Sequence, residues 1–370
     1  MKYQICRRCI MDTSDPTIRF DSNGVCNHCK EAEYRISQCP KEGREARLQE
    51  LVTTIKSEGE GKEYDCIIGV SGGADSTAVA FHVKRLGLRP LAIHFDNGWN
   101  SELAVDNITR TLEALEIDLF TYVVDWEEFR DLQLCFLKAS LANCEAPTDH
   151  GIDALLFKMA KKYNTRFILS GSNLATESIM PISWGHYTQD LRLLKAVHAK
   201  FGKVPLRTMP LMTVRDYIKS VFFHKIRQIP FLNYVDYNKD SAKEMFAREI
   251  GWRDYGGKHY ESVWTRFFQG YYLPKKFGFD KRRAHLSSMI ISGQINREDA
   301  LDQMKLATYD SSLFTQDLDF VVKKFNLTQQ EFDELINTPN RTASDYPNSL
   351  FLFHKLMWAK NVFRSIATKA

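Results

Sequence analysis

Along residues 64–170, the pattern of apolar and polar positions predicts strands and helices that follow one another in turn. Apolar runs rich in β-branched residues predict strands at 64–70, 89–95, 118–124 and 166–170. Apolar residues at helical spacing predict helices at 75–86, 101–115, 126–141 and 150–163. Strands that alternate with helices of this length indicate an α/β fold with a doubly wound parallel sheet.

The segments on either side of this region have mainly helical patterns. An exposed amphipathic helix is predicted at 40–60. Beyond residue 180 the predicted helices are 186–201, 213–227, 240–250, 261–273, 283–292 and 297–306. The remainder indicates a small helical bundle, in which Thr328 and Glu331 are spaced as a capping box.

The first predicted strand leads directly into Ser71-Gly72-Gly73-Ala74-Asp75-Ser76, and a helix follows. Two glycines allow the backbone to approach an anion closely, and the helix N-terminus then directs N–H groups and a positive dipole end toward it. Ser71 and Ser76 add hydroxyl donors, and Asp75 is placed to hold a divalent cation. An ordinary β–α turn is the simpler alternative. No Gly-Lys-Ser/Thr follows, so this is not a Walker loop.

Further polar residues follow the other strands, at the edge of a parallel sheet where ligands bind. Asp96 is either part of a turn or a nucleoside contact, and Asp149 is either a helix cap or a functional group at the rim. The stretch from Gly171 to Glu177 suits a second phosphate and metal loop, in which Glu177 shares Mg2+ with Asp75.

Composition narrows the class of protein. The chain has 370 residues, of which 44% are hydrophobic and 26% charged, as in ordinary soluble globular proteins. The net charge of +4 does not favour a nucleic-acid surface, which needs a strong basic stripe. No stretch is long and apolar enough for a membrane span or a signal peptide, so we expect a cytoplasmic protein without a membrane partner.

Four of the eight cysteines have the spacing of a metal site. Cys6 and Cys9 form one CxxC pair, and Cys26 and Cys29 form a second. Thiolates at this spacing predict a four-cysteine ribbon around a structural Zn2+, since a closed four-thiolate site has no open position for catalysis. Two disulfides are the alternative, which a cytoplasmic protein disfavours.

Two later stretches combine glycines, aromatic residues and charges. The first, 251–262, contains Lys258 and His259, and the second, 273–283, contains Lys276, Lys281 and Arg282. A solvated basic face is the ordinary interpretation of such charges. The interleaved glycines and aromatic residues favour instead a pocket for an anionic substrate and departing pyrophosphate.

The four-cysteine ribbon, the SGGADS loop, Gly-Ser-Asn-Leu-Ala-Thr-Glu at 171–177 and Lys-Phe-Gly-Phe-Asp-Lys-Arg-Arg at 276–283 together resemble the N-acetyl sugar amidotransferases. These are PP-loop enzymes of the N-type ATP pyrophosphatase superfamily. The resemblance implies that ATP and ammonia convert an acetamido group of a nucleotide-linked sugar into an acetamidino group. The implied substrate is UDP-2,3-diacetamido-2,3-dideoxymannuronate, in O-antigen synthesis. A sister branch acts on pseudaminic or legionaminic acid derivatives.

The resemblance and the residues together assign provisional roles. Ser71, Gly72, Gly73 and Ser76 are expected to bind the ATP phosphates, with Asp96 and Gly171 nearby, and Asp75 and Glu177 to hold Mg2+. Lys258, Lys276, Lys281 and Arg282 are expected to bind pyrophosphate or the anionic groups of the substrate. His259 or Asp149 would handle a proton during ammonia attack.

The chain has no recognisable ammonia source, since no cysteine follows Met1 as an N-terminal glutaminase nucleophile. In the family that it resembles, partner subunits like the glutaminase and cyclase halves of imidazole glycerol phosphate synthase supply ammonia. We therefore expect such partners.

Three other functions compete with this one, and an asparagine synthetase-like or other small-molecule ligase is one of them. A PP-loop tRNA sulfurtransferase would need further cysteines, but Cys144 is followed by Pro147 where a CxxC would have its second cysteine. A zinc-ribbon nucleic-acid-binding module would fit neither the intact SGGADS loop nor the mild charge. The predicted organisation is a ribbon (1–38), a linker helix (39–62), a PP-loop domain (63–210) and a helical substrate-binding region (211–370).

Overall fold

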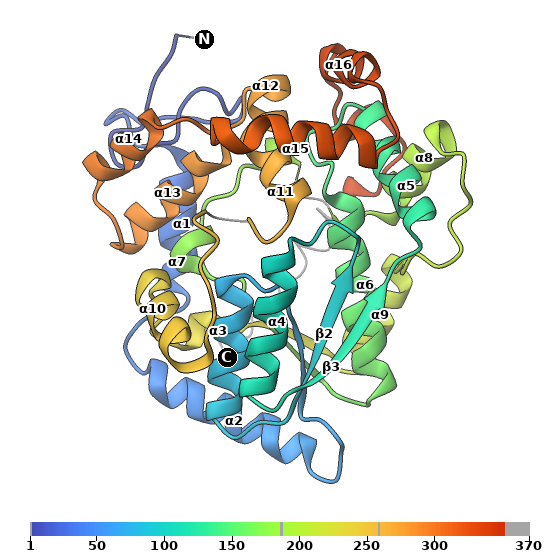
Figure 1. The fold of residues 1–370 in the computed structure, drawn as a ribbon. Helices are drawn as coiled ribbons and strands as arrows, with labels where there is room; N and C mark the ends of the chain where they lie inside the picture. The colour runs from blue at the N-terminus through green and yellow to red at the C-terminus, as the bar shows by residue number, and fades with distance from the viewer. Residues whose placement is uncertain (1, 186–187, 258–259, 352–370) are drawn as a thin grey trace.

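A five-stranded parallel sheet forms the centre of the computed structural model, which describes residues 2–185, 188–257 and 260–351 (Figure 1). The strand order is β3-β2-β1-β4-β5, and every neighbouring pair is parallel. The strands are β1 (Cys66–Gly69), β2 (Pro90–Asp96), β3 (Asp118–Val123), β4 (Phe167–Ser170) and β5 (Arg227–Pro230). The chain moves outward from β1 in both directions, which confirms the predicted doubly wound sheet.

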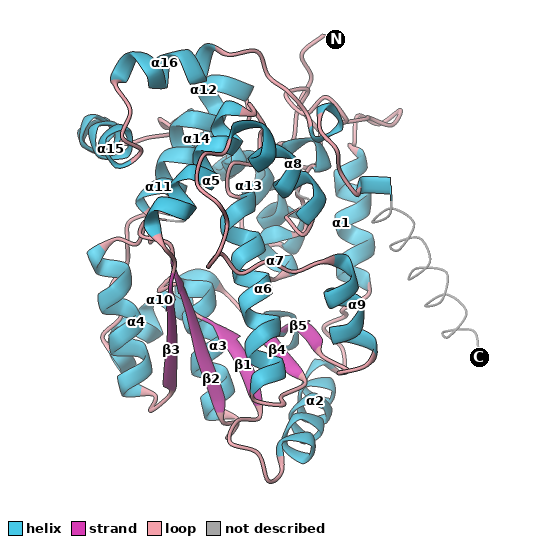
Figure 2. Ribbon diagram, turned by 90° about the vertical axis from the view of Figure 1, so that its right-hand side faces the viewer, coloured by secondary structure: helices cyan, strands magenta, loops and turns pink. Residues whose placement is uncertain are grey.

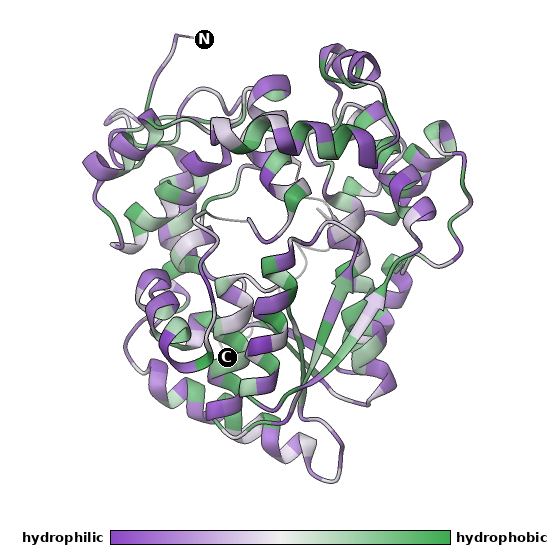
Figure 3. Ribbon diagram, in the orientation of Figure 1, coloured by the Kyte–Doolittle hydropathy of each residue, from purple (hydrophilic) through white to green (hydrophobic). Residues whose placement is uncertain are grey.

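Helices cover both faces of the sheet, because successive side chains of a strand point to opposite faces. On β1, Ile67 belongs to one apolar core and Ile68 to the other. Figure 3 shows hydrophobic residues concentrated on the strands and on the sides of the helices turned toward them. The Ile68 side is covered by α2 (Arg44–Gly59), α3 (Ala74–Arg85), α4 (Glu102–Ala114) and α10 (Lys239–Ile250). The Ile67 side is covered by α5 (Trp126–Lys138), α6 (Ala146–Lys162) and α9 (Val214–Phe222).

Short polar side chains begin several of these helices. Ser101 accepts a hydrogen bond from the Ala104 N–H at the start of α4, so it has the N-cap role that its sequence position allowed. Thr328 and Glu331 form the predicted reciprocal capping box.

The C-terminal part is helical and lies beyond the carboxyl ends of the strands (Figure 2). Val263 to Phe277 is one continuous helical rod, in which five residues (Phe268–Tyr272) have π-helical hydrogen bonding. The helices of the C-terminal part are α11 (Val263–Phe267), α12 (Leu273–Phe277), α13 (Lys281–Ser292), α14 (Arg297–Lys305), α15 (Ser311–Lys324) and α16 (Gln329–Asn337). Between β4 and α9 the chain forms α7 (Leu174–Glu177), which packs against α13, and α8 (Leu191–Phe201), which packs against α5.

The N-terminal segment ends in helix α1 (Asn27–Ser37) and contacts α13 and α14. The Ile10 N–H donates to Ser287 Oγ at 3.2 Å. The Arg283 Nη1 donates to the Ile10 carbonyl at 2.6 Å. The ribbon is therefore fixed to the C-terminal helices, although these segments lie at opposite ends of the sequence.

One strand was not predicted. We expected a single helix over 213–227, but α9 ends at Phe222 and the chain turns through Lys225, whose φ is +54°. Residues Arg227–Pro230 then pair with β4 as an edge strand. This strand extends the sheet past residue 210, where we expected the α/β domain to end.

Candidate functional site

Three adjoining pockets lie at the carboxyl ends of the strands, and Glu177 lines all of them. The phosphate pocket, with a volume of about 220 Å³, contains the SGGADS loop. The main cleft, about 810 Å³, runs from this loop along β2, β4 and α6. The side pocket, about 250 Å³, lies between α7, the π-helical turn and α13.

The SGGADS loop forms its own network of hydrogen bonds. The Ser71 N–H donates to Ser76 Oγ at 3.2 Å, and Ser76 Oγ donates to the Gly73 carbonyl at 3.0 Å. Gly73 is the N-cap residue of α3, so the positive end of this helix opens onto the pocket. The strand–loop–helix arrangement is as predicted, and it suits a phosphate group.

Two aromatic side chains that line the phosphate pocket donate hydrogen bonds to the loop. Trp252 Nε1 and Tyr255 Oη each donate to the Gly72 carbonyl at 2.9 Å. Gly72 has a φ of +81°, and a Cβ there would lie 2.6 Å from the Ala104 carbonyl oxygen. Gly72 is therefore required both by its backbone conformation and by the close contact with α4.

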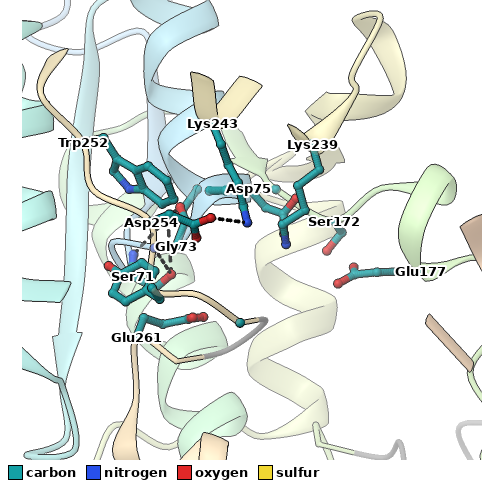
Figure 4. A pocket seen from close by; sticks show the side chains of 15 residues that line it. Ser71, Gly73, Asp75, Ser172, Glu177, Lys239, Lys243, Trp252, Asp254 and Glu261 are labelled. Carbon is teal, nitrogen blue, oxygen red and sulfur yellow. Dashed lines mark hydrogen bonds and ion pairs between the residues drawn. The ribbon is translucent and has the colours of Figure 1, made fainter. Parts of the chain in front are cut away.

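Acidic and basic side chains alternate around the loop (Figure 4). Tyr237 Oη donates to Asp75 Oδ1 at 2.6 Å, and Lys239 Nζ lies 3.3 Å from Asp75 Oδ2. One helical turn further along α10, Lys243 Nζ donates to Asp254 Oδ2 at 2.8 Å. Burial together with the Asp75 carboxylate raises the pKa of Tyr237, which keeps this phenol protonated as a donor.

The second predicted loop meets the first one. A Cβ on Gly171 would lie 3.1 Å from the Asp75 carbonyl, so the residue at 171 must be small for β4 and α3 to approach. Asn173 accepts from the Thr176 N–H and begins α7, which carries Glu177 into the pocket. Asp75 and Glu177 thus line one pocket, together with Ser172. Carboxylate and hydroxyl oxygens are donors that suit Mg2+.

Asp149 lies in the main cleft on α6, with Glu145 and Asp153 one turn away on either side. Desolvation by the surrounding walls raises the pKa of Asp149 to about 8, and the neighbouring Glu145 adds to this effect. The Asp149 side chain is exposed at the wall of the cleft. This carboxyl group can therefore take up or release a proton near neutral pH.

The cations of the side pocket are each paired with an acid. Lys281 Nζ lies 3.8 Å from Glu145, and it lines both the side pocket and the main cleft. Arg282 pairs with Asp280 at 2.7 Å and donates to the Leu306 carbonyl at 3.0 Å.

Gln269, in the π-helical turn, lines both the side pocket and the main cleft, as does Glu177. π-helical turns of this kind are frequent at functional sites.

Three described residues that we predicted for the ATP and substrate site, Gly72, Lys276 and Asp96, lie outside the linings of these three pockets. Lys276 is buried, and its Nζ donates to the carbonyls of Leu335, Ile336 and Thr338 at the end of α16. The expected substrate role is therefore replaced by a structural one, because three carbonyls already satisfy this ammonium group. Asp96 accepts from the Gly98 N–H at 2.9 Å, which is the turn that the sequence allowed as an alternative.

Lys258 and His259, which we expected in the substrate pocket, lie outside the described residues. Their neighbours Gly257 and Tyr260 line the side pocket.

The four cysteines of the ribbon form a closed cluster. Cys6, Cys9, Cys26 and Cys29 are buried, and their sulfur atoms all lie within 4.8 Å of one another. The Sγ–Sγ distances are 3.8 Å for Cys6–Cys29 and 3.6 Å for Cys9–Cys26. A tetrahedron with Zn–S bonds of about 2.3 Å has edges of about 3.8 Å, so the cluster fits Zn2+. The Met11 N–H also donates to Cys9 Sγ at 3.3 Å, as expected for a thiolate.

Lys239 and Lys243 are pocket residues that the sequence did not reveal. They lie on α10, far along the chain from the SGGADS loop, and only the packing of α10 on α3 brings them together. Their spacing of one helical turn was the one available signal, and surface lysines at this spacing are common.

Comparison with known families found a match in the C-terminal part. Residues 261–360 match the family model described as "LPS biosynthesis protein WbpG-like, C-terminal domain". This region of the chain is therefore similar to that domain, and we call it the WbpG-like region. This matched region contributes Glu261, Gln269 and Lys281 to the main cleft and Arg282 to the side pocket. The WbpG-like region therefore meets the SGGADS loop in one continuous site.

A search of the curated proteins found no match. Solved structures with some likeness include NMN synthetase from Francisella tularensis, with a TM-score of 0.30 and 14% identity over 59% of this chain and 89% of that chain. The NH3-dependent NAD synthetase from Campylobacter jejuni has a TM-score of 0.29 and 15% identity over 54% of this chain and 82% of that chain. The predicted subunit of tRNA methyltransferase from Methanocaldococcus jannaschii has a TM-score of 0.29 and 13% identity over 49% of this chain and 72% of that chain. These TM-scores are too low to add to the topology seen directly.

Within the described part of the chain, no helix has both the length and the apolar character that a membrane crossing requires.

Proposed function

We propose that this protein is an ATP-dependent amidotransferase that converts the acetamido group of a nucleotide-activated sugar into an acetamidino group. The observation that carries the proposal is the single site shared by the SGGADS loop and the WbpG-like region. The substrate is an N-acetylated sugar of surface-polysaccharide synthesis, with UDP-2,3-diacetamido-2,3-dideoxymannuronate as the first compound to test. The protein works in the cytoplasm, where activated sugars are made.

The reaction has two steps. An amide carbonyl is a poor electrophile, so its oxygen first attacks the α-phosphorus of ATP and pyrophosphate leaves. Ammonia then attacks the activated carbon, a proton is lost, and AMP departs with the former amide oxygen. The amidine carbon thus exchanges a C–O bond for a C–N bond.

The residues of the phosphate pocket supply positioning and charge. Ser71, Gly73 and Ser76 face the phosphates, and Lys239 and Lys243 offset the charge of departing pyrophosphate. Asp75 and Glu177 would hold Mg2+. When bound, this ion supplies positive charge to the phosphate oxygens.

The main cleft and the side pocket would hold the acceptor sugar. Lys281 and Arg282, which line the side pocket, are proposed for the anionic groups of the substrate and for catalysis, and the sequence adds Lys258 and His259 to this proposal. Asp149 is proposed as the acceptor of the proton that the nitrogen loses after ammonia attacks, because the pKa of Asp149 is raised to about 8. Ammonia would come from glutaminase and cyclase-like partner subunits.

The cysteines of the described chain argue against sulfur transfer. Cys144 is buried, and its Sγ donates to the Leu141 carbonyl at 3.3 Å. Burial raises the pKa of this thiol to about 12, so little thiolate forms. None of the three pockets has a cysteine among its described lining residues.

The test is pyrophosphate release from ATP plus ammonium, with UDP- and CMP-linked diacetamido sugars and bulk tRNA as acceptors. We expect release that depends on a sugar, together with a product in which NH replaces the amide oxygen by mass spectrometry. Release that depends on tRNA, with none on sugars, would overturn the proposal.

A further inference from the structure

The carboxylate of Asp75 has an ammonium group as a neighbour in the structure. Lys239 Nζ lies 3.3 Å from Asp75 Oδ2, and only 15% of the Lys239 side chain and 23% of the Asp75 side chain are exposed. Tyr237 donates to the other carboxylate oxygen at 2.6 Å. The Lys239 ammonium group therefore lies beside Asp75 Oδ2, on a side of the carboxylate from which a divalent cation would approach.

The phosphate pocket has both acidic and basic side chains. Its described lining residues include the carboxylates of Asp75, Glu177, Asp254 and Glu261 and the ammonium groups of Lys239 and Lys243. The Asp75 carboxylate repels a polyphosphate that enters the pocket unless a cation lies between them. This arrangement favours ATP bound together with a divalent cation.

We propose that Lys239 is an internal counter-ion of Asp75, which a divalent cation displaces so that the released ammonium group can bind the phosphates of ATP. This inference rests on the proposed function, because it takes Asp75 as a ligand of that cation. Lys239 is on α10 and lines the phosphate pocket together with the SGGADS loop, so its displaced ammonium group stays beside the proposed position of the phosphates.

Binding of the cation and of ATP is then mutually favourable. Without ATP, the cation must displace an ammonium group that has no phosphate to accept it. Without the cation, Lys239 stays paired with Asp75 and is not available to bind the phosphates. Each ligand removes the cost of binding the other, which is positive coupling between two sites.

The experiment measures Mn2+ binding to the intact protein by the electron paramagnetic resonance signal of free Mn2+. It is done with and without α,β-methylene-ATP, which cannot be cleaved at the reacting bond. In Lys239→Met, we expect Mn2+ alone to bind about five-fold more tightly or better, and the enhancement by the nucleotide to shrink. Binding of the nucleotide itself should weaken.

Lys243→Met is the matched control. It removes the same charge from the same helix and pocket, but its ammonium group is bound to Asp254 at 2.8 Å rather than to Asp75. Its effect on Mn2+ binding without nucleotide should be clearly smaller. Arg248→Met, at an exposed cation of the same helix, should change nothing. Thermal unfolding of each variant shows whether the fold is retained.

The outcomes separate this inference from the proposed function. If Lys239→Met binds Mn2+ no more tightly than Lys243→Met while Asp75→Asn loses it, only the counter-ion role is overturned. If Asp75→Asn binds Mn2+ as well as the unchanged protein, both the counter-ion role and the cation site are overturned.

Discussion

The four-cysteine cluster and the phosphate pocket both gather ionisable side chains, but they are assembled in different ways. The cluster takes all four of its cysteines from residues 6–29, and their side chains are buried close to one another. The phosphate pocket draws on α3, α7, α10 and the segment at 252–261, and it opens to solvent. A closed cluster suits a metal ion that remains bound and stabilises the fold. An open pocket suits a ligand that binds and leaves in each reaction cycle. Damage to the cluster should therefore affect folding, and damage to the pocket should affect turnover.

The largest effect should come from breaking the cluster with Cys26→Ser. Structural zinc sites contribute about 10 kcal/mol or more to the folding of the segments that hold them. We expect loss of bound zinc and a much lower unfolding temperature, measured by elemental analysis and thermal denaturation. Cys39→Ser, at a half-buried cysteine outside the cluster, is the control and should behave like the unchanged protein. Equal zinc content in both variants would contradict the metal site.

Asp75→Ala should leave the fold and abolish the chemistry. Removing a group that holds charge at the transition state costs about 10²–10³-fold in rate, and here it removes the principal proposed cation ligand. Pyrophosphate release is the measurement, and zinc content and circular dichroism should be unchanged. Asp240→Ala, at an exposed acid of α10, is the control. Loss of zinc or solubility in Asp75→Ala would point to a structural residue instead.

Asp149→Asn tests the proton acceptor in the main cleft. General-base catalysis contributes about 10²-fold or more, so we expect a loss of that size in pyrophosphate-coupled amidine formation. Because the active form is the ionised carboxylate, the rate of the unchanged protein should rise with pH through about 8. This rise should be absent in the variant. A variant with the same pH profile as the unchanged protein would assign the proton transfer to another group.

The same substitution has a predictable effect on stability. The folded protein holds a proton on Asp149 at pH values where the unfolded chain has lost it, since its pKa is raised to about 8. Stability is therefore lost as the pH rises from the unfolded pKa to the folded one. The gain in unfolding temperature from Asp149→Asn should be larger at pH 9 than at pH 5.

Arg297→Ala tests the link between the cluster and the helices above the sheet. Arg297 donates to the Cys9 carbonyl at 3.0 Å and to the Cys6 carbonyl at 2.9 Å. Losing hydrogen bonds from a charged donor should lower the free energy of unfolding by about 1.5–3 kcal/mol, measured in urea, with zinc retained. Lys305→Ala, at an exposed residue of α14, should have no such effect.

The smallest effect should come from Trp252→Phe. This change removes one of two hydrogen bonds to the Gly72 carbonyl, while Tyr255 still donates. We expect a loss of about 1 kcal/mol in stability and a severalfold higher KM for ATP. An unchanged KM would show that Tyr255 alone holds the loop.

Local patterns were sufficient for part of this structure. The strand before Ser71, the loop and the helix after Gly73 follow from apolar spacing and two glycines, and the cysteine cluster follows from two CxxC pairs. Each of these features is encoded within a few dozen residues. The edge strand β5 was missed, because its four residues are mostly exposed and include a proline. These residues form a strand because they pair with β4. The sequence pattern of 227–230 alone does not predict that pairing.

Features that depend on contacts between distant segments were not predictable. The cations of 276–283 resemble an anion site in the sequence, but they separate in space. Lys276 binds carbonyls of α16, Arg283 contacts the ribbon, and of these cations Lys281 alone borders the main cleft. Conversely, Lys239 and Lys243 had no local signature, since only the packing of α10 beside α3 turns them toward the loop.

Helix α13 has a consequence for protein engineering. One of its sides contacts the ribbon through Arg283 and Ser287, and the other carries Lys281, Arg282 and His285 into the side pocket. The ribbon is thus not a detachable module. A truncated protein that starts after residue 38 would leave one side of α13 bare, and a chimera with a foreign ribbon would need a matching α13. Libraries that aim to change the acceptor should therefore vary both sides of this helix together.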